Sequence, residues 1–269
     1  MLDGTLLLVG CGKMGGALAR GWLAAGLDPD RLHIIEPDVE SVADLIAGGA
    51  HHHNQITDLQ ERLAPRVILF AVKPQAMADV LPAFAPLVEN GTLVMSIAAG
   101  TPIARFEDAF GLCAVIRVMP NTPAAIGRGM SVLCANGAAN ADDRALGERL
   151  MAAVGEVAFI DDEDLMHAVT AVSGSGPAYV FWLAECLARA GTEAGLEPDL
   201  AARLANVTVT GAGALIEAAS LPPETLRRNV TSPGGTTEAA LAVLTAEPGL
   251  APLMVAAVAA AEKRSRDLA

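Results

Sequence analysis

The feature that most constrains the fold is a glycine-rich loop directly after an apolar run near the start of the chain. Residues 6–9, Leu-Leu-Leu-Val, have the continuous apolar character of a strand buried on both faces of a parallel sheet. Three glycines follow in G-x-G-x-x-G spacing, and an apolar helical pattern over residues 14–25 comes next. Strand, tight turn and helix in this order predict a dinucleotide-binding βαβ unit, with the pyrophosphate at the start of the helix. The first glycine permits the turn, the second lets the backbone approach the pyrophosphate, and the third lets the helix pack on the strand. The cofactor-binding residues expected in this loop are Gly10, Gly12, Lys13, Met14 and Gly15.

Further apolar runs follow, and the character of the chain changes after about Asp161. Up to that point strand-like runs alternate with helical patterns, which predicts an α/β fold with a doubly wound, Rossmann-type sheet. The expected strands are residues 6–9, 32–35, 67–72, 93–97, 114–118, 130–134 and 156–160. The helices expected beyond Asp161 are residues 164–170, 177–194, 198–219, 222–229, 236–245 and 251–268. We therefore predict a dinucleotide-binding domain over residues 1–161 and an all-helical domain over residues 162–269.

Composition limits the partners and the location of the chain. The formal charge of −13 disfavours nucleic acid and anionic membrane surfaces as partners. No run is long and apolar enough for a membrane span, so we expect a soluble, cytoplasmic protein. The four cysteines are scattered without a C-x-x-C pair, which disfavours structural zinc. Residues 51–53 are three histidines, which we expect in a polar loop, and we predict no metal site. Gly211 and Gly213 lie inside one expected helix, where a kink or a close helix contact would explain them.

The residue that ends the second expected strand bears on the choice between NAD and NADP. It is Glu36, followed by Pro37 and Asp38, with no lysine or arginine close behind. A carboxylate at this position accepts hydrogen bonds from the ribose hydroxyls and repels a 2′-phosphate. We therefore predict a preference for NADH, with an exposed loop acid of no special role as the alternative.

The ends of later strands supply further candidates, because ligands bind at the carboxyl ends of strands in such sheets. Lys73 follows the third expected strand, and its side chain is expected either at the phosphates and ribose or in solvent. The loop after the fifth is shaped by Pro120 and Pro123, and its Asn121 is a candidate polar contact near the nicotinamide. The cofactor-binding residues expected at these ends are Ala71, Val72, Lys73, Pro74, Ala98, Ala99 and Asn121.

Two segments break the helical pattern of the second expected domain. They are residues 173–179, Ser-Gly-Ser-Gly-Pro-Ala-Tyr, and residues 229–237, which end in Ser-Pro-Gly-Gly-Thr-Thr. Each places small or hydroxylated residues at an expected helix start, where free N–H groups bind carboxylates. Ordinary capping by serine and threonine is the alternative for either segment alone. Together with a dinucleotide loop, the pair favours a reductase of a small carboxylated substrate.

With these segments, the chain resembles the pyrroline-5-carboxylate reductases over essentially its whole length. The resemblance rests on the glycine loop, on residues 71–74, 96–100 and 119–123, and above all on residues 173–179 and 232–237. It implies that NAD(P)H reduces 1-pyrroline-5-carboxylate to L-proline, the last step of proline biosynthesis. It also implies that the helical domain is a dimerisation domain whose helices are exchanged between subunits, so that each active site uses both chains.

The resemblance assigns substrate-binding residues. Ser232, Gly235, Thr236 and Thr237 match the loop whose N–H groups and hydroxyls hold the carboxylate. Thr237 matches the threonine that hydrogen-bonds the ring nitrogen, so it is the expected catalytic residue. Ser175 belongs to the other matching segment and is counted with the substrate-binding residues.

On the cofactor side, the resemblance assigns two asparagines and raises one question. Asn229 matches a polar residue just before the substrate loop, and Asn54 matches an adenosine-side asparagine, although the loop before it is shortened. The family mostly uses NADPH, with a small hydroxyl or amide residue where this chain has Glu36. That departure puts the usual cofactor preference in question here.

The chemistry fits these residues, and two other functions compete with it. Hydride transfer to a protonated cyclic imine needs orientation more than acid catalysis, and the proton comes from solvent or from the Thr237 hydroxyl. A β-hydroxyacid dehydrogenase needs a catalytic lysine in the first long helix of its second domain, and residues 177–194 contain none. A dinucleotide sensor would bind cofactor without turnover, but it has no use for the intact substrate loop.

Overall fold

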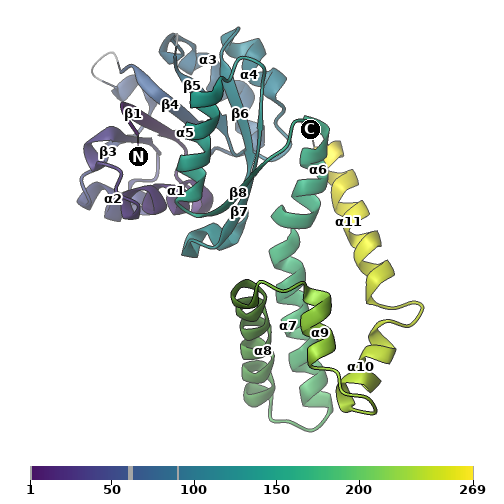
Figure 1. Cartoon of the computed structure of the whole chain (residues 1–269). Helices are drawn as coiled ribbons and strands as arrows, with labels where there is room; N and C mark the ends of the chain where they lie inside the picture. Colours follow the sequence, from purple (N-terminus) through teal and green to yellow (C-terminus); the bar gives the residue numbers. More distant parts are fainter. Residues whose placement is uncertain (1, 60–62, 90, 269) are drawn as a thin grey trace. The chain divides into compact units, whose positions relative to one another are not determined.

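The computed structural model describes residues 2–59, 63–89 and 91–268. They form two compact units: unit 1 runs up to Gly174 and resumes at Glu262, and unit 2 comprises Ser175–Ala261. Figure 1 shows a sheet with helices in unit 1 and helices alone in unit 2. The Rossmann-type sheet and the helical second part expected from the sequence are therefore confirmed.

Unit 1 is built, within the described residues, on an eight-stranded sheet in the order β3-β2-β1-β4-β5-β6-β7-β8. All neighbouring strands pair in parallel except β6 and β7, which are antiparallel. The first six strands therefore end at one edge, with the switch in strand order between β1 and β4. The strands are β1 Thr5–Val9, β2 Leu32–Ile35, β3 His51–His53, β4 Pro65–Phe70, β5 Leu93–Ser96, β6 Ala114–Met119, β7 Gly129–Ala135 and β8 Gly155–Phe159.

Helices pack on both faces of the sheet because the central strands carry apolar side chains on both sides. Leu6 and Leu8 of β1 belong to one core, and Leu7 belongs to the other. In the first core, fully buried Trp22 donates from Nε1 to the Leu150 carbonyl, 2.8 Å away, and so joins two helices. The helices of unit 1 are α1 Lys13–Ala24, α2 Ala43–Ala47, α3 Met77–Phe84, α4 Ile103–Phe110, α5 Ala141–Ala152 and α6 Met166–Val169.

The three histidines expected in a polar loop instead form β3, and that expectation was wrong. Pairing with β2 decides their conformation, and it brings His33 opposite His51. The ring of His33 stacks on those of His51 and His53, with centroids 4.5 and 5.3 Å apart. Nδ1 of His33 and Nε2 of His53 are 3.1 Å apart. In the described part of the chain, no group of three or more His, Cys, Asp or Glu side chains is arranged to hold a metal ion.

The stacked histidines predict a loss of stability in acid. Burial, with the neighbouring histidines, lowers the pKa of His33 to about 4, and burial also lowers the pKa of His53. Because the folded chain disfavours the protonated rings, their contribution to stability is present above the unfolded pKa of about 6.5. It is lost as the pH falls from there toward the folded pKa of His33. We expect the Tm to fall between about pH 7.5 and about pH 5, and His33→Asn to make that fall smaller. An equal fall in Tm in the wild type and in His33→Asn would show that His33 is not the cause of the loss of stability in acid.

Unit 2 exposes an unusual amount of apolar surface for a single chain. Phe181 and Trp182 are 61% and 56% exposed. The helix that contains Gly191 and the helix that contains Ala201 pack closely, since a Cβ at Gly191 would lie 3.2 Å from the Cβ of Ala201. Surface of this kind is typical of a face that another subunit covers. The helices are α7 Gly176–Glu193, α8 Pro198–Ala219, α9 Pro223–Asn229, α10 Thr236–Leu244 and α11 Leu250–Asp267, whose last turns belong to unit 1.

Two helical features differ from the sequence-based expectations. The expected non-helical segment before α7 is largely replaced by helical structure. Helix α6 continues into a π-helical turn, Thr170–Gly174, and α7 begins directly beyond Ser175. Helix α8 runs through Gly211 and Gly213, and a Cβ at either would meet no atom of the chain within 4 Å. Among the described residues, no single helix has the length and apolar character needed to cross a membrane, and only α8 and α9 together, bent by 115°, meet that measure.

Candidate functional site

The glycine loop joins β1 to α1 at the carboxyl edge of the sheet, and close contacts require two of its glycines. Gly10 has a φ of +87°, and a Cβ there would lie 2.8 Å from Cγ1 of Val72. A Cβ at Gly15 would lie 2.5 Å from the carbonyl oxygen of Gly10, where no Cβ fits. These two positions therefore hold α1 directly against the strand ends.

Gly12 is different, because the space around its α-carbon is open. It caps α1 without a side-chain hydrogen bond, and a Cβ there would meet no atom within 4 Å. The first N–H groups of α1, at Lys13, Met14 and Gly15, have no acceptor within the helix. No acidic residue stands in the first turn. This cradle fits a dinucleotide pyrophosphate, which the N–H groups and the helix dipole would hold.

The carboxylate of Glu36 lies against the glycine loop at the end of β2. Oε2 accepts from the N–H of Cys11 at 2.7 Å, and Oε1 accepts from the N–H of Asp38 at 3.1 Å. Both oxygens keep lone pairs for ribose hydroxyls. Glu36 is half-buried, so it is not a freely solvated loop acid. Burial, helped by the Glu36 charge, raises the pKa of the Cys11 thiol to about 12, which keeps this cysteine protonated and unreactive.

Asn54 follows β3, and the pairing of β2 with β3 brings it to the corner where Glu36 lies. The N–H of Glu36 donates to the carbonyl of His53 at 3.0 Å, and Nε2 of His52 lies 2.8 Å from the carbonyl oxygen of Glu36. The N–H of Asn54 donates to Asp58 at 3.1 Å, and its side chain is exposed. This corner is the adenosine end of the candidate cofactor site.

The remaining expected cofactor residues lie at the ends of β4, β5 and β6, across the glycine loop from Glu36. Lys73 is exposed and precedes the short turn Pro74–Ala76. Ala98 is buried, and its N–H donates to Oγ of Ser96 at 3.2 Å. Asn121 follows the end of β6, and its amide group makes three hydrogen bonds to protein atoms, two to Ser173 and one to Met130.

In unit 2, residues 232–235 form a β-turn that leads into α10. The N–H of Gly235 donates to the Ser232 carbonyl at 3.0 Å, and Gly234 follows Pro233 with a φ of +70°, as in a type II turn. A Cβ at Gly235 would lie 2.7 Å from Oγ of Ser232. The N–H of Gly234 donates to the Glu238 carboxylate at 2.7 Å, which ties the turn to the first turn of α10.

Helix α10 begins with an uncapped amino terminus. Its N-cap is Gly235, with no side-chain hydrogen bond, so ordinary serine or threonine capping does not describe it. The N–H groups of Thr236, Thr237 and Glu238 have no acceptor within the helix, and two hydroxyls stand beside them. The N–H of Gly235 already donates to Ser232 inside the turn, so it is not available to a ligand. Glycine is needed here because a Cβ would be too close to Ser232. Asn229, the last residue of α9, is exposed.

Ser175 stands where the sequence predicts a second free helix start. The predicted helix start is present, since Ser175 is the N-cap of α7, but a π-helical turn and not a loop precedes it. Its side chain makes no capping hydrogen bond to α7. The start of α10 therefore follows a turn, whereas the start of α7 follows helical structure directly.

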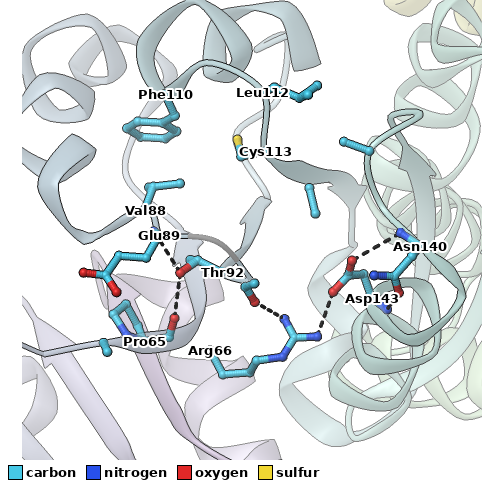
Figure 2. A pocket seen from close by; sticks show the side chains of 14 residues that line it. Pro65, Arg66, Val88, Glu89, Thr92, Phe110, Leu112, Cys113, Asn140 and Asp143 are labelled. Atoms are coloured by element: carbon cyan, nitrogen blue, oxygen red, sulfur yellow. Dashed lines mark hydrogen bonds and ion pairs between the residues drawn. The ribbon is translucent and has the colours of Figure 1, made fainter.

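Another hollow, of about 870 Å³, lies at the opposite edge of the sheet, where β4, β5 and β6 begin. Figure 2 shows that Arg66 and Asp143 in its lining pair with each other. Arg66 donates to Asp143 at 2.7 Å and to the Gly91 carbonyl at 2.8 Å, and the Thr92 hydroxyl donates to the Pro65 carbonyl at 3.0 Å. With these groups satisfied, the hollow is a structural feature and not a candidate for the dinucleotide.

Two family models match the chain. The model described as pyrroline-5-carboxylate reductase dimerisation matches residues 163–268. The model described as NADP oxidoreductase, coenzyme F420-dependent, matches residues 5–100. The matches coincide with the helical part and with the first strands of the sheet.

Three of the relatives and solved structures similar to this chain are named as pyrroline-5-carboxylate or pyrroline carboxylate reductases. Pyrroline-5-carboxylate reductase of Pseudomonas aeruginosa is 39% identical over 98% of this chain and 96% of its own. The structure of a pyrroline-5-carboxylate reductase from Coxiella burnetii has a TM-score of 0.93 and 32% identity, covering 100% of this chain and 99% of the other. Pyrroline carboxylate reductase of Plasmodium falciparum with NADP bound has a TM-score of 0.83 and 29% identity, covering 100% and 99%.

Proposed function

Because the chain belongs to the pyrroline-5-carboxylate reductase family, we propose that its glycine loop binds the cofactor and that residues 232–237 bind the substrate. The enzyme transfers hydride from NAD(P)H to the imine carbon of 1-pyrroline-5-carboxylate and forms L-proline, in the last step of proline biosynthesis. The assignment of the substrate site rests on one observation. The start of α10 has no side-chain cap, and the turn before it is fixed by the hydrogen bond from Gly234 to Glu238. It provides donors for a carboxylate in a chain whose net charge of −13 otherwise repels anions.

At the substrate, the N–H groups of Thr236 and Thr237 and the hydroxyls of Ser232 and Thr236 hold the carboxylate. The Thr237 hydroxyl hydrogen-bonds the ring nitrogen and so orients the imine carbon. The protonated imine is already electrophilic, and the proton on its nitrogen comes from this hydroxyl or from solvent. Ser175 is proposed as a further substrate contact.

At the cofactor, NAD(P)H supplies the hydride from its nicotinamide ring when it is bound. The loop at Gly12 and the start of α1 hold its pyrophosphate, and Glu36 with Asn54 holds the adenosine half. Ala71, Val72, Lys73, Pro74, Ala98 and Ala99 line the other half, and Asn229 is proposed as a contact from the helical domain.

The test is the loss of reduced-nicotinamide absorbance with pyrroline-5-carboxylate, run in parallel with NADH and NADPH. Turnover with at least one cofactor is expected. Cofactor binding without turnover would overturn the proposal and would favour a dinucleotide sensor.

Glu36 is expected to favour NADH. Its fixed carboxylate repels a 2′-phosphate, so Glu36→Ser should raise the ratio of kcat/KM for NADPH to that for NADH about tenfold, equivalent to about 1.4 kcal/mol. Glu148→Ser, which removes an exposed charge on α5, is the control and should leave the ratio unchanged. A wild-type enzyme that already prefers NADPH would show that Glu36 does not have this role.

The helical domain mediates self-association, and the domain boundary is part of the proposal. We place the cofactor domain over residues 1–161 and the dimerisation domain over residues 162–269, with helices exchanged between subunits. Location in the cytoplasm and the absence of nucleic-acid and membrane partners stay predictions from composition.

A further inference from the structure

The side chain of Asn121 joins two segments that are far apart in the sequence. Nδ2 lies 3.2 Å from Oγ of Ser173 and 3.3 Å from its carbonyl oxygen. Oδ1 accepts from the N–H of Met130 at 2.9 Å, at the start of β7. Both donors of the amide are therefore used by Ser173 and one lone pair of its oxygen by Met130, so a ligand that accepts from this amide would have to compete with Ser173.

A second contact joins the same two segments. Met119, at the end of β6, packs against Gly174, where an added Cβ would overlap its terminal methyl group. Gly174 closes the π-helical turn Thr170–Gly174, and Ser173 is the residue before it. Such turns are rare and occur often at functional sites. The end of β6 and the loop after it are thus held to this turn by the apolar contact of Met119 and by the two polar contacts between Asn121 and Ser173.

The position of that loop gives the contacts a consequence for catalysis. It leaves the carboxyl end of β6, and in this strand order β4, β5 and β6 form the nicotinamide half of the cofactor site. Misplacing a reacting group by about 1 Å can reduce a rate about a hundredfold. We propose that Asn121 is a positioning residue, which fixes the nicotinamide-side loop by bonding it to Ser173 of the π-helical turn. This inference rests on the proposed reduction.

The chain offers a matched control in Asn136. Its Nδ2 donates to the Cys113 carbonyl at 2.9 Å and to Glu107 at 2.8 Å, and its Oδ1 accepts from the N–H groups of Val115 and Ala139, both at 3.1 Å. It is therefore also a bridging asparagine with a fully used amide. It lies just beyond β7, beside the start of β6, at the edge opposite the cofactor.

We expect Asn121→Ala and Asn136→Ala both to lower the Tm, and only Asn121→Ala to lower kcat. That fall should be at least about tenfold per folded enzyme, with KM for pyrroline-5-carboxylate changed less than about threefold. The Kd of ADP-ribose, which lacks the nicotinamide, should stay within about twofold. A normal kcat in Asn121→Ala, or an equal fall in Asn136→Ala, would overturn the inference. Wild-type turnover in the same assay separates this failure from failure of the proposed reduction.

Ser173→Ala tests the route through the π-helical turn. It removes one of the two Ser173 contacts and should lower kcat severalfold in an otherwise folded enzyme. In a double-mutant cycle, the losses from Asn121→Ala and Ser173→Ala should combine to less than their product, because both break the same link. Independent, fully multiplying losses would show that Asn121 acts directly on the cofactor and would overturn the proposal.

Discussion

Replacing Thr237 with alanine is expected to lower kcat/KM for pyrroline-5-carboxylate about a hundredfold, with little effect on the Kd of the dinucleotide. Thr237 is half-buried at the uncapped start of α10, where its hydroxyl is assigned to the ring nitrogen. A hydrogen bond to a charged group contributes about 1.5–3 kcal/mol, and loss of orientation adds to the effect. Cofactor binding should change little because none of the pyrophosphate or adenosine contacts is assigned to Thr237.

The measurement is steady-state kinetics with saturating cofactor, together with a fluorescence titration of the reduced dinucleotide. Thr237→Ser keeps the hydroxyl and is the matched control, which should retain most of the activity. A near-normal kcat/KM in Thr237→Ala would remove this residue from the mechanism. A parallel loss of dinucleotide binding would show that the variant disturbs more than the substrate loop.

Gly12→Val is expected to weaken dinucleotide binding at least about a hundredfold without unfolding the protein. A Cβ at Gly12 would meet no protein atom within 4 Å, and its φ of −64° suits any residue, so the fold should accept the side chain. The same open space is where a pyrophosphate must approach the start of α1, and a branched side chain would fill it. The loss of the phosphate contacts and of the helix-dipole contribution accounts for the size of the effect.

Gly137→Val provides the matched control for this substitution. Gly137 is exposed, and a Cβ there also meets nothing within 4 Å, but it lies in the loop between β7 and α5, at the other edge of the sheet. Both variants should keep a Tm within a few degrees of wild type, and only Gly12→Val should lose affinity for the reduced dinucleotide in a fluorescence titration. Unchanged affinity in Gly12→Val would mean that the pyrophosphate does not bind at this loop.

The sequence predicted the central strands and the glycine loop because both depend on local signals. Strands buried on two faces are apolar throughout, as in residues 6–9, and the glycines are required by contacts within a single βαβ unit. Strand β3 escaped prediction because its three histidines carry no apolar signal. Their conformation follows from pairing with β2, a tertiary contact that no short window contains.

The candidate site also has features that follow from local sequence and features that depend on tertiary contacts. The Ser-Pro-Gly-Gly turn could be predicted from its residues, since proline followed by glycine sets its type. Which of its donors remain open could not, because that depends on Gly235 bonding back to Ser232 and on the reach of the Glu238 side chain. The link from Asn121 to Ser173 was equally hidden, since the partners are separated by 52 residues and the π-helical turn has no sequence signature.

The last turns of α11 belong to unit 1, although the whole of unit 2 precedes them in the chain. Ser265 is buried there, with its Oγ 3.0 Å from Nδ1 of His167 on α6. A ribosome makes this segment only after every residue of unit 2, so a nascent chain cannot finish its cofactor-binding unit first. The dinucleotide unit can therefore complete its fold only after the helical segment that mediates self-association has been synthesised.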